Sequence, residues 1–169
     1  MFEDLSREDL EGMLHDAALN WLAHDGLWFQ AIERKAGMET AIELDAEAWS
    51  TFTVIEAKRI MKRHGIAPGG GIPALAEALG HRLYAFINEQ EIAEQTESRL
   101  VFRMNRCRVQ DARKRKGLPD FPCKPVGLVE YAGFAQTIDP RIETRCVGCP
   151  PDEHPDGWSC AWEFTLRDE

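Results

Sequence analysis

RLVFRMNRC, at residues 99–107, is the stretch that decides the fold, because its apolar side chains alternate. In an extended chain, one face carries Leu100, Phe102 and Met104, and the other carries Val101, Arg103, Asn105 and Cys107. This alternation predicts a β-strand whose apolar face covers a core and which ends at Cys107.

Three other segments have the composition of strands and fit around this one. INEQEIAEQ at 87–95 precedes it across a turn at 96–98, and RIETRC at 141–146 and SCAWEFTLR at 159–167 form a closing pair. Helical segments precede and separate these strands. The order predicts an α+β fold: a four-stranded antiparallel sheet with helices on one face, plus an N-terminal helical hairpin.

The N-terminal hairpin is predicted from apolar residues at steps of three and four. A first helix begins at Ser6, where Asp9 completes a capping-box-like arrangement. We expect residues 24–26, His-Asp-Gly, to bend or interrupt it before it ends at Gly37. A second long helix then runs to Gly65 and folds back on the first.

The glycine run IAPGGGI is the one stretch with linker chemistry. It divides the chain into an N-terminal helical hairpin at 1–65, a Gly-rich linker at 66–72, and an α+β domain with a C-terminal cysteine cluster at 73–169. Further helices are expected in ALAEALGHRLYAFI, VQDARKRKG and VGLVEYAGFAQTI.

Composition and charge limit the classes of partner. The net charge of −9 over 169 residues opposes broad binding to nucleic acid or to an anionic membrane. The acidic N-terminus lacks the apolar region of a signal peptide, so we expect a cytoplasmic protein. Cations gather between Arg99 and Lys124, where ARKRKG reads either as a solvated helix face or as an anion site.

Sulfur and imidazole gather near the C-terminus, in RCVGCPPDEHPDGW and the SCAWEF that follows. Cys146, Cys149, His154 and Cys160 have spacing close to that of a zinc knuckle, although Pro150-Pro151 removes two N–H donors. His154 is alternatively a solvent-facing loop residue. Five cysteines, an odd number, favour thiols or metal ligands over disulfides in a reducing compartment.

Cys107 and Cys123 each lie where a helix is expected to begin. The partial positive charge of a helix N-terminus, with Arg106 and Arg108 beside Cys107, would lower the pKa of such a thiol. The alternative is that both are small buried apolar residues.

Three segments carry a resemblance: NRCRVQDARKRKGLPDFPC, KPVGLVEYAGFAQTIDPRIETRC and GWSCAWEF. They resemble the C-terminal half of the L-2-amino-thiazoline-4-carboxylic acid hydrolase-like family, and more distantly the 4-vinyl reductase-type small-molecule-binding domain. The matching positions are Arg106-Cys107, Cys123, and Cys160 with Phe164. The resemblance implies that Cys107, Cys123 and Cys160 approach one another; Lys124-Pro125, and the extra Cys146 and Cys149, depart from the family pattern.

Converging thiolates would repel one another, so the cluster predicts either a bound cation or protonated, inert thiols. For the first alternative, the expected metal ligands are Cys123, Cys146, Cys149 and Cys160, with His154 less favoured. The cofactor would be zinc, or alternatively an iron–sulfur cluster.

The helical half offers a second candidate site, because carboxylates fall among apolar residues there. Asp45 and Glu56 share a helical stripe with aromatic residues, which favours buried ion pairs such as Glu56 with Arg59. Alternatively Asp25, Trp28, Asp45 and Glu56 line one wall of a ligand pocket.

These observations lead to a functional hypothesis and an alternative. The hypothesis is a metal-binding protein with a small-molecule pocket beside the cysteine cluster, acting as a hydrolase on a small nitrogen- or sulfur-containing carboxylic acid. Metal-bound water or the Cys107 thiolate would attack, and Arg106 or Arg103 would bind the carboxylate. The alternative is a non-enzymatic sensor or adaptor with structural zinc and a homodimer interface on the N-terminal helices. Nucleic-acid binding is the least favoured class.

Overall fold

The computed structural model describes residues 2–167, which form an α+β fold, as predicted. The helices are α1 (Arg7–Ala36), α2 (Met38–His64), α3 (Gly71–Leu79), the 3-10 turn η1 (Leu83–Phe86), α4 (Arg108–Arg115) and α5 (Lys124–Ile138). The strands are β1 (Glu89–Gln95), β2 (Arg99–Arg106), β3 (Ile142–Gly148) and β4 (Cys160–Leu166).

The four strands form one antiparallel sheet in the order β1-β2-β4-β3. β4 therefore lies between β2 and β3, and its residues Cys160 and Trp162 pair with Met104 and Phe102 of β2. The strand at 99–107 is central, and its predicted apolar face is buried. All four strands expected from the sequence are confirmed.

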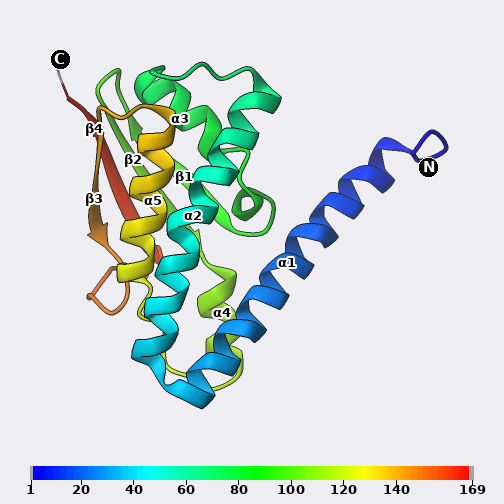
Figure 1. The fold of residues 1–169 in the computed structure, drawn as a ribbon, viewed down its shortest axis with the longest axis vertical. Coiled ribbons are helices and arrows are strands. Elements are labelled where there is room, and N and C mark those ends of the chain that lie inside the picture. The colour runs from blue at the N-terminus through cyan, green and yellow to red at the C-terminus, as the bar shows by residue number, and fades with distance from the viewer. Residues whose placement is uncertain (1, 168–169) are drawn as a thin grey trace.

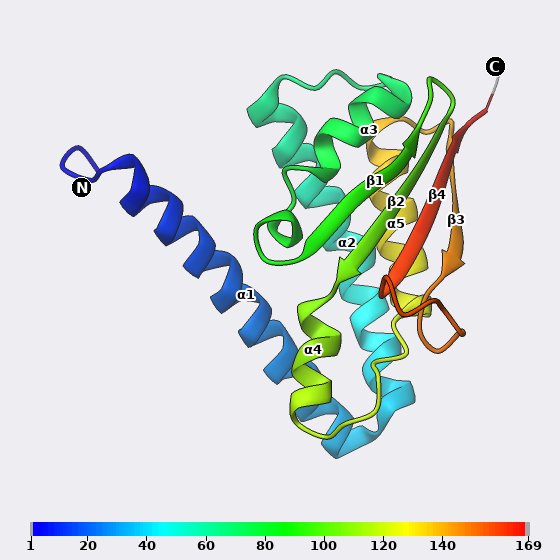
Figure 2. The same cartoon turned by 180° about the vertical axis from the view of Figure 1, so that it is seen from behind.

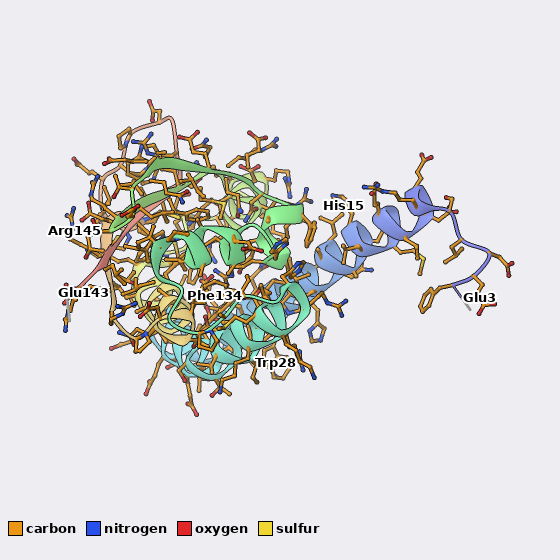
Figure 3. The ribbon with its side chains drawn as sticks, turned by 90° about the horizontal axis from the view of Figure 1, so that it is seen from above. Glu3, His15, Trp28, Phe134, Glu143 and Arg145 are labelled. Atoms are coloured by element: carbon orange, nitrogen blue, oxygen red, sulfur yellow. The ribbon has the colours of Figure 1, made fainter. Side chains whose placement is uncertain are left out.

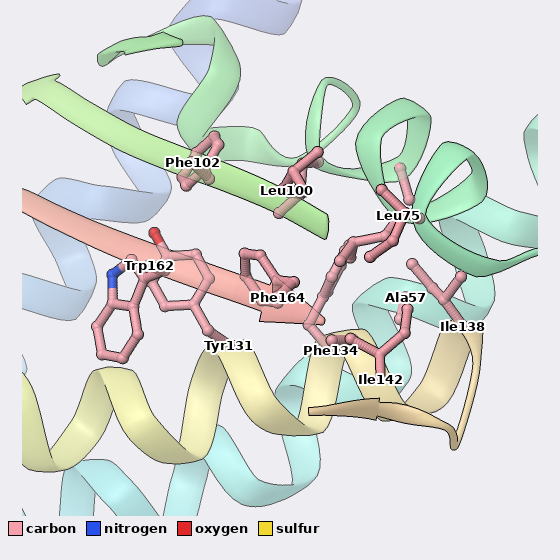
Figure 4. Packing of buried hydrophobic residues seen from close by; sticks show 14 of the residues in the cluster. Ala57, Leu75, Leu100, Phe102, Tyr131, Phe134, Ile138, Ile142, Trp162 and Phe164 are labelled. Atoms are coloured by element: carbon pink, nitrogen blue, oxygen red, sulfur yellow. The ribbon is translucent and has the colours of Figure 1, made fainter. Parts of the chain in front are cut away.

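Helices cover one face of the sheet, with α5 against the strands and α2 beyond it (Figures 1 and 2). Figure 4 shows Phe164 and Trp162 of β4 packing on Tyr131 and Phe134 of α5. The close approach requires glycine at Gly127, where a Cβ atom would lie 2.6 Å from the Trp162 ring. The layers therefore pack as sheet, α5 and α2 around a single core.

Core residues come from both sides of the predicted linker. Ala57 and Ile60 of α2 belong to the same apolar cluster as Leu75 of α3 and Phe164 of β4. The second half of the glycine run does not remain a linker, since Gly71 begins α3, with its backbone N–H donating to the buried Asp139 at 3.0 Å. The N-terminal helices thus share their packing with the sheet domain.

α1 is continuous through residues 24–26, so the expected interruption there is wrong. A single glycine in a helix costs only about 1 kcal/mol, and the flanking residues maintain the helix. The capping box at Ser6 and Asp9 is confirmed, and the chain reverses at Gly37, where φ is 89°. Neither α1 nor any other helix within residues 2–167 has the length and apolar character needed to cross a membrane.

The first half of α1 projects away from the rest of the molecule (Figures 1 and 3). Its apolar residues are exposed there: Leu10 by 41%, Met13 by 51% and Leu14 by 45%. The second half of α1 returns to the body and passes α4, where it forms part of a cavity.

Candidate ligand cavity

A cavity of about 540 Å³ lies between α1, α4, the start of α5 and one end of the sheet. Its walls also include residues from α2, η1 and the segments that join β2 to α4 and β3 to β4. This volume falls in the range of sites that hold small molecules. The cavity contains two chemically distinct groups of side chains: carboxyl groups beside aromatic rings, and thiols.

Carboxyl groups from three helices line the cavity: Asp25 of α1, Asp45 of α2 and Glu130 of α5. Burial, together with the nearby charges of Asp25 and Glu130, raises the pKa of Asp45 to about 7, against the lowering effect of a hydrogen bond with the Trp49 side chain. Burial also raises the pKa of Asp25. Among residues 2–167, no lysine or arginine forms an ion pair with either aspartate.

Glu130 belongs to a buried ion cluster centred on Arg82. The Arg82 guanidinium lies 2.9 Å from Glu56 and 2.7 Å from Glu130, and all three side chains are almost fully buried. Four aromatic rings surround it, with Phe134 closest at 4.8 Å from the ring centroid. Two carboxyl groups therefore share one guanidinium, and burial raises the pKa of Glu130. The expected Glu56–Arg59 pair is therefore wrong, because Glu56 points into the core and Arg59 into solvent.

Aromatic side chains form the wall beside these acids. Trp49 stacks on Tyr84 at 6.0 Å between centroids, and Tyr131 stacks on Trp162 at 4.7 Å. All four line the cavity. The indole N–H of the fully buried Trp162 has no hydrogen-bond partner among the described residues, so a donor is available at this wall (Figure 4).

Four cysteines line the other part of the cavity: Cys107, Cys123, Cys149 and Cys160. They gather because β2 and β3 end, and β4 and α5 begin, at the same end of the sheet (Figure 2). The sulfurs of Cys123 and Cys149 are 3.3 Å apart. The resemblance implied that Cys107, Cys123 and Cys160 approach one another, and the sequence left two alternatives for them, a bound cation or protonated thiols.

The pKa is raised for two of these thiols, Cys107 and Cys149. Burial raises the pKa of Cys107 to about 12, although the backbone N–H groups of Gln110 and Val109 act in the opposite direction. Hydrogen bonding with Cys123 and Cys160, and then burial, raise the pKa of Cys149. Of the two alternatives for Cys107, its raised pKa favours the small buried apolar residue over the reactive thiolate, because desolvation is the larger effect.

The predicted metal site is wrong. Within residues 2–167, no group of three or more Cys, His, Asp or Glu side chains is arranged to hold a metal ion. This removes the expected metal ligands Cys123, Cys146, Cys149 and Cys160, and with them zinc, the iron–sulfur cluster and structural zinc in an adaptor. His154 instead stacks on Trp158, with ring centroids 5.7 Å apart, in the loop between β3 and β4. The hydrolase hypothesis falls too, since it required metal-bound water or a Cys107 thiolate.

Residues 3–166 match the model of a family of unknown function, DUF6125. The chain belongs to this family. The match covers the projecting part of α1 as well as the cavity and the sheet. No curated protein matches the sequence. Because the function of the DUF6125 family is unknown, membership assigns no activity to this chain. The resemblance to the thiazoline hydrolase-like family stays a prediction.

Four of the six residues expected to bind a ligand lie outside the cavity of this DUF6125 chain, and one of them is Glu56, which pairs with Arg82 in the core. Strand alternation places Arg103 on the face opposite Met104, where it pairs with Glu91. Arg106 is exposed and pairs with Asp111 at 2.7 Å. Trp28 is 67% exposed on the outer side of α1. Of the predicted ligand-binding set, Asp25 and Asp45 line the cavity.

The sequence reasoning missed Arg82, Tyr84, Glu130 and Trp162 as site residues. One available signal was Glu130, which interrupts the otherwise apolar VGLVEYAGFAQTI segment. A carboxylate in such a helix needs a buried partner, just as Asp45 and Glu56 do. The partner itself lies 48 residues earlier in the chain, at Arg82, so no local pattern indicates it.

Proposed function

We propose that this protein binds a small organic cation, an amine carrying an aromatic or apolar body, in the cavity between α1, α4, α5 and the sheet. One observation carries the proposal: Asp25 and Asp45 line a largely aromatic cavity and have no lysine or arginine partner among the described residues. An ammonium group of the ligand, in contact with Asp25 and Asp45, would supply the positive charge that no lysine or arginine among the described residues supplies.

The aromatic wall supports the same ligand class. Trp49 and Tyr84 lie beside the carboxyl groups, and the faces of such rings attract cations. Arg82 already uses this property inside the protein, where it lies over four rings. The unpaired indole N–H of Trp162 would donate to a hydroxyl or carbonyl oxygen on the ligand body.

One observation supports the carboxylate ligand that was expected from the sequence. Arg108, Arg115 and Lys116 of α4 also line the cavity. Lys116 donates a hydrogen bond to Gln30 at 2.9 Å, so this cation lies farther along α1 than Asp25. An amine that also carries a carboxylate would therefore be oriented with its two charges toward opposite ends of the cavity.

The compartment proposed for this binding is the cytoplasm. All five cysteines are free thiols, including the adjacent pair Cys123 and Cys149. Thiols so close together persist in a reducing environment.

The test is calorimetric titration with three matched compounds that share a phenyl ring: phenethylamine, phenylpropionate and phenylalanine. We expect the two amines to bind and the simple carboxylate to bind at least tenfold more weakly, which corresponds to about 1.4 kcal/mol. Amine affinity should rise between pH 6 and pH 8 as Asp45, with its pKa of about 7, loses its proton.

Variants locate the binding. Asp45→Asn and Asp25→Asn should each weaken amine binding, whereas Glu47→Gln, which removes an exposed carboxylate from the same helix as Asp45, should not. Tighter binding of phenylpropionate, or no amine binding at about 1 mM, would overturn the proposal.

A further inference from the structure

Two of the thiols that line the cavity, Cys123 and Cys149, are in contact. Their sulfurs are 3.3 Å apart, and a disulfide bond is about 2.05 Å long, so closure needs a movement of only about 1.3 Å. The two residues lie 26 positions apart in the chain, on different elements. The tertiary fold, rather than a local turn, therefore brings the two thiols into contact.

Backbone and side-chain contacts hold Cys149 on the α5 side of the cavity. The Lys124 N–H donates to the carbonyl of Pro150 at 2.9 Å, and the Lys124 ammonium lies 2.6 Å from Asp152. These contacts fix the loop after β3 against the residue that follows Cys123. Cys160, the other thiol near Cys149, is held in β4 by its pairing with Met104.

Exposure distinguishes the two thiols. Cys123 is half-buried and lines the cavity, whereas Cys149 is 1% exposed. A small reagent that enters the cavity therefore contacts Cys123 more readily. Cys149, which is more deeply buried, is placed to react second.

We propose that Cys123 and Cys149 form a redox modification site that reacts with a low-molecular-weight disulfide of the glutathione type. Cys123 loses its proton and attacks one sulfur of the reagent, forming a mixed disulfide and releasing one thiol. Cys149 then loses its proton and attacks the Cys123 sulfur, forming the internal disulfide and releasing the second thiol. The cysteine pair gives up two electrons and two protons, and the reagent gains both.

Closure would change the cavity, because two of its four thiols become one disulfide that ties the start of α5 to the loop after β3. The loop of chain enclosed by the new bond would also lose freedom in the unfolded state. We therefore expect the oxidised protein to melt several degrees higher than the reduced protein, by about 5 °C.

The sequence provides a direct assay on the full-length protein. Trypsin cleaves after Lys116, Arg141 and Arg145, but not between Lys124 and Pro125, so Cys123 falls in peptide 117–141 and Cys149 in peptide 146–167. Protein oxidised with glutathione disulfide, alkylated and digested should yield these two peptides joined, and dithiothreitol should separate them.

Peptide 146–167 also contains Cys146 and Cys160, so variants assign the bond. Cys123→Ser and Cys149→Ser should each abolish the joined species, and Cys146→Ser, which alters a neighbouring thiol on the same hairpin, should retain it. Because Cys123 is half-buried, its serine variant is expected to fold, and its helical circular dichroism checks this.

Three results would overturn the inference. The first is a disulfide confined to peptide 146–167, which would join two of Cys146, Cys149 and Cys160. The second is a joined species that persists in Cys149→Ser. The third is wild-type protein that keeps all five thiols after exposure to glutathione disulfide.

Discussion

The Arg82 guanidinium and the Glu56 carboxylate form an ion pair of 2.9 Å in the core, beneath η1 and α2. Their side chains are 3% and 10% exposed, and Glu130 makes the second contact with Arg82. The pair connects the N-terminal hairpin to the segment that leads into the sheet. Glu130, which shares the guanidinium with Glu56, also lines the cavity.

Arg82→Met should therefore destabilise the protein strongly, because it leaves Glu56 and Glu130 buried without a cation. We expect a loss of about 3–5 kcal/mol in the free energy of unfolding, measured by urea titration. Arg59→Met is the matched control, since Arg59 is the exposed partner suggested by sequence alone, and it should change stability by less than about 0.5 kcal/mol. Equal effects of the two variants would contradict the pairing.

The Arg82 cluster illustrates which parts of this fold sequence patterns could predict. The strand at 99–107 was predictable because alternation is a local property, and the cap at Ser6 because capping involves residues three apart. The partner of Glu56 was not, because it depends on how η1 packs over α2. The continuity of α1 through Gly26 was missed for a related reason: a single glycine weakens a helix without ending it.

The cysteines show the same limit at the level of the site. The family resemblance implied their convergence, but cysteine spacing does not fix the directions in which sulfurs point. The local sequence also did not show that Cys107 is buried. Burial raises the pKa of this thiol, whereas the neighbouring arginines suggested a lowered pKa. Proximity in the fold was predictable, whereas ligand geometry and protonation were not.

Asp45 should make stability decrease as pH rises through neutrality. Its pKa is raised from 3.8 to about 7, so the folded state holds a proton that the unfolded state releases between these values, and stability falls over that interval. After discounting for solvent screening, we expect Asp45→Asn to gain about 2 kcal/mol at pH 8 and almost nothing at pH 4. Urea unfolding at both pH values measures this, and a gain of equal size at both would rule out the titration of Asp45 as its cause.

Asp139 should show the opposite pH dependence. Hydrogen bonds from Arg141 and from the backbone N–H groups of Arg141 and Gly71 lower its pKa from 3.8 to about 2. The folded state therefore favours the ionised carboxylate, and this contribution is present above about pH 4 and lost as pH falls toward 2. Asp139→Asn should cost about 2 kcal/mol at pH 7, with a smaller difference at pH 3.

The control for Asp139 is Asp152→Asn, which removes a carboxylate that is 43% exposed and has a single lysine partner. It should change the free energy of unfolding by less than about 1 kcal/mol at pH 7. A cost for Asp139→Asn that stays constant from pH 7 to pH 3 would show that the ionised form of the carboxylate is not what the fold stabilises.

The projecting half of α1 allows a test of the homodimer expected from the sequence. Leu10, Met13 and Leu14 form one exposed apolar stripe at helical spacing, and the same stripe on a second copy would cover it. Sedimentation should then give twice the 19.2 kDa mass of one chain, and Leu14→Glu should reduce it to a single chain without loss of helicity. Glu8→Gln, on the opposite face of the helix, should leave the dimer intact. Wild-type protein that sediments at 19.2 kDa at micromolar concentration would show instead that this surface is not a contact between copies.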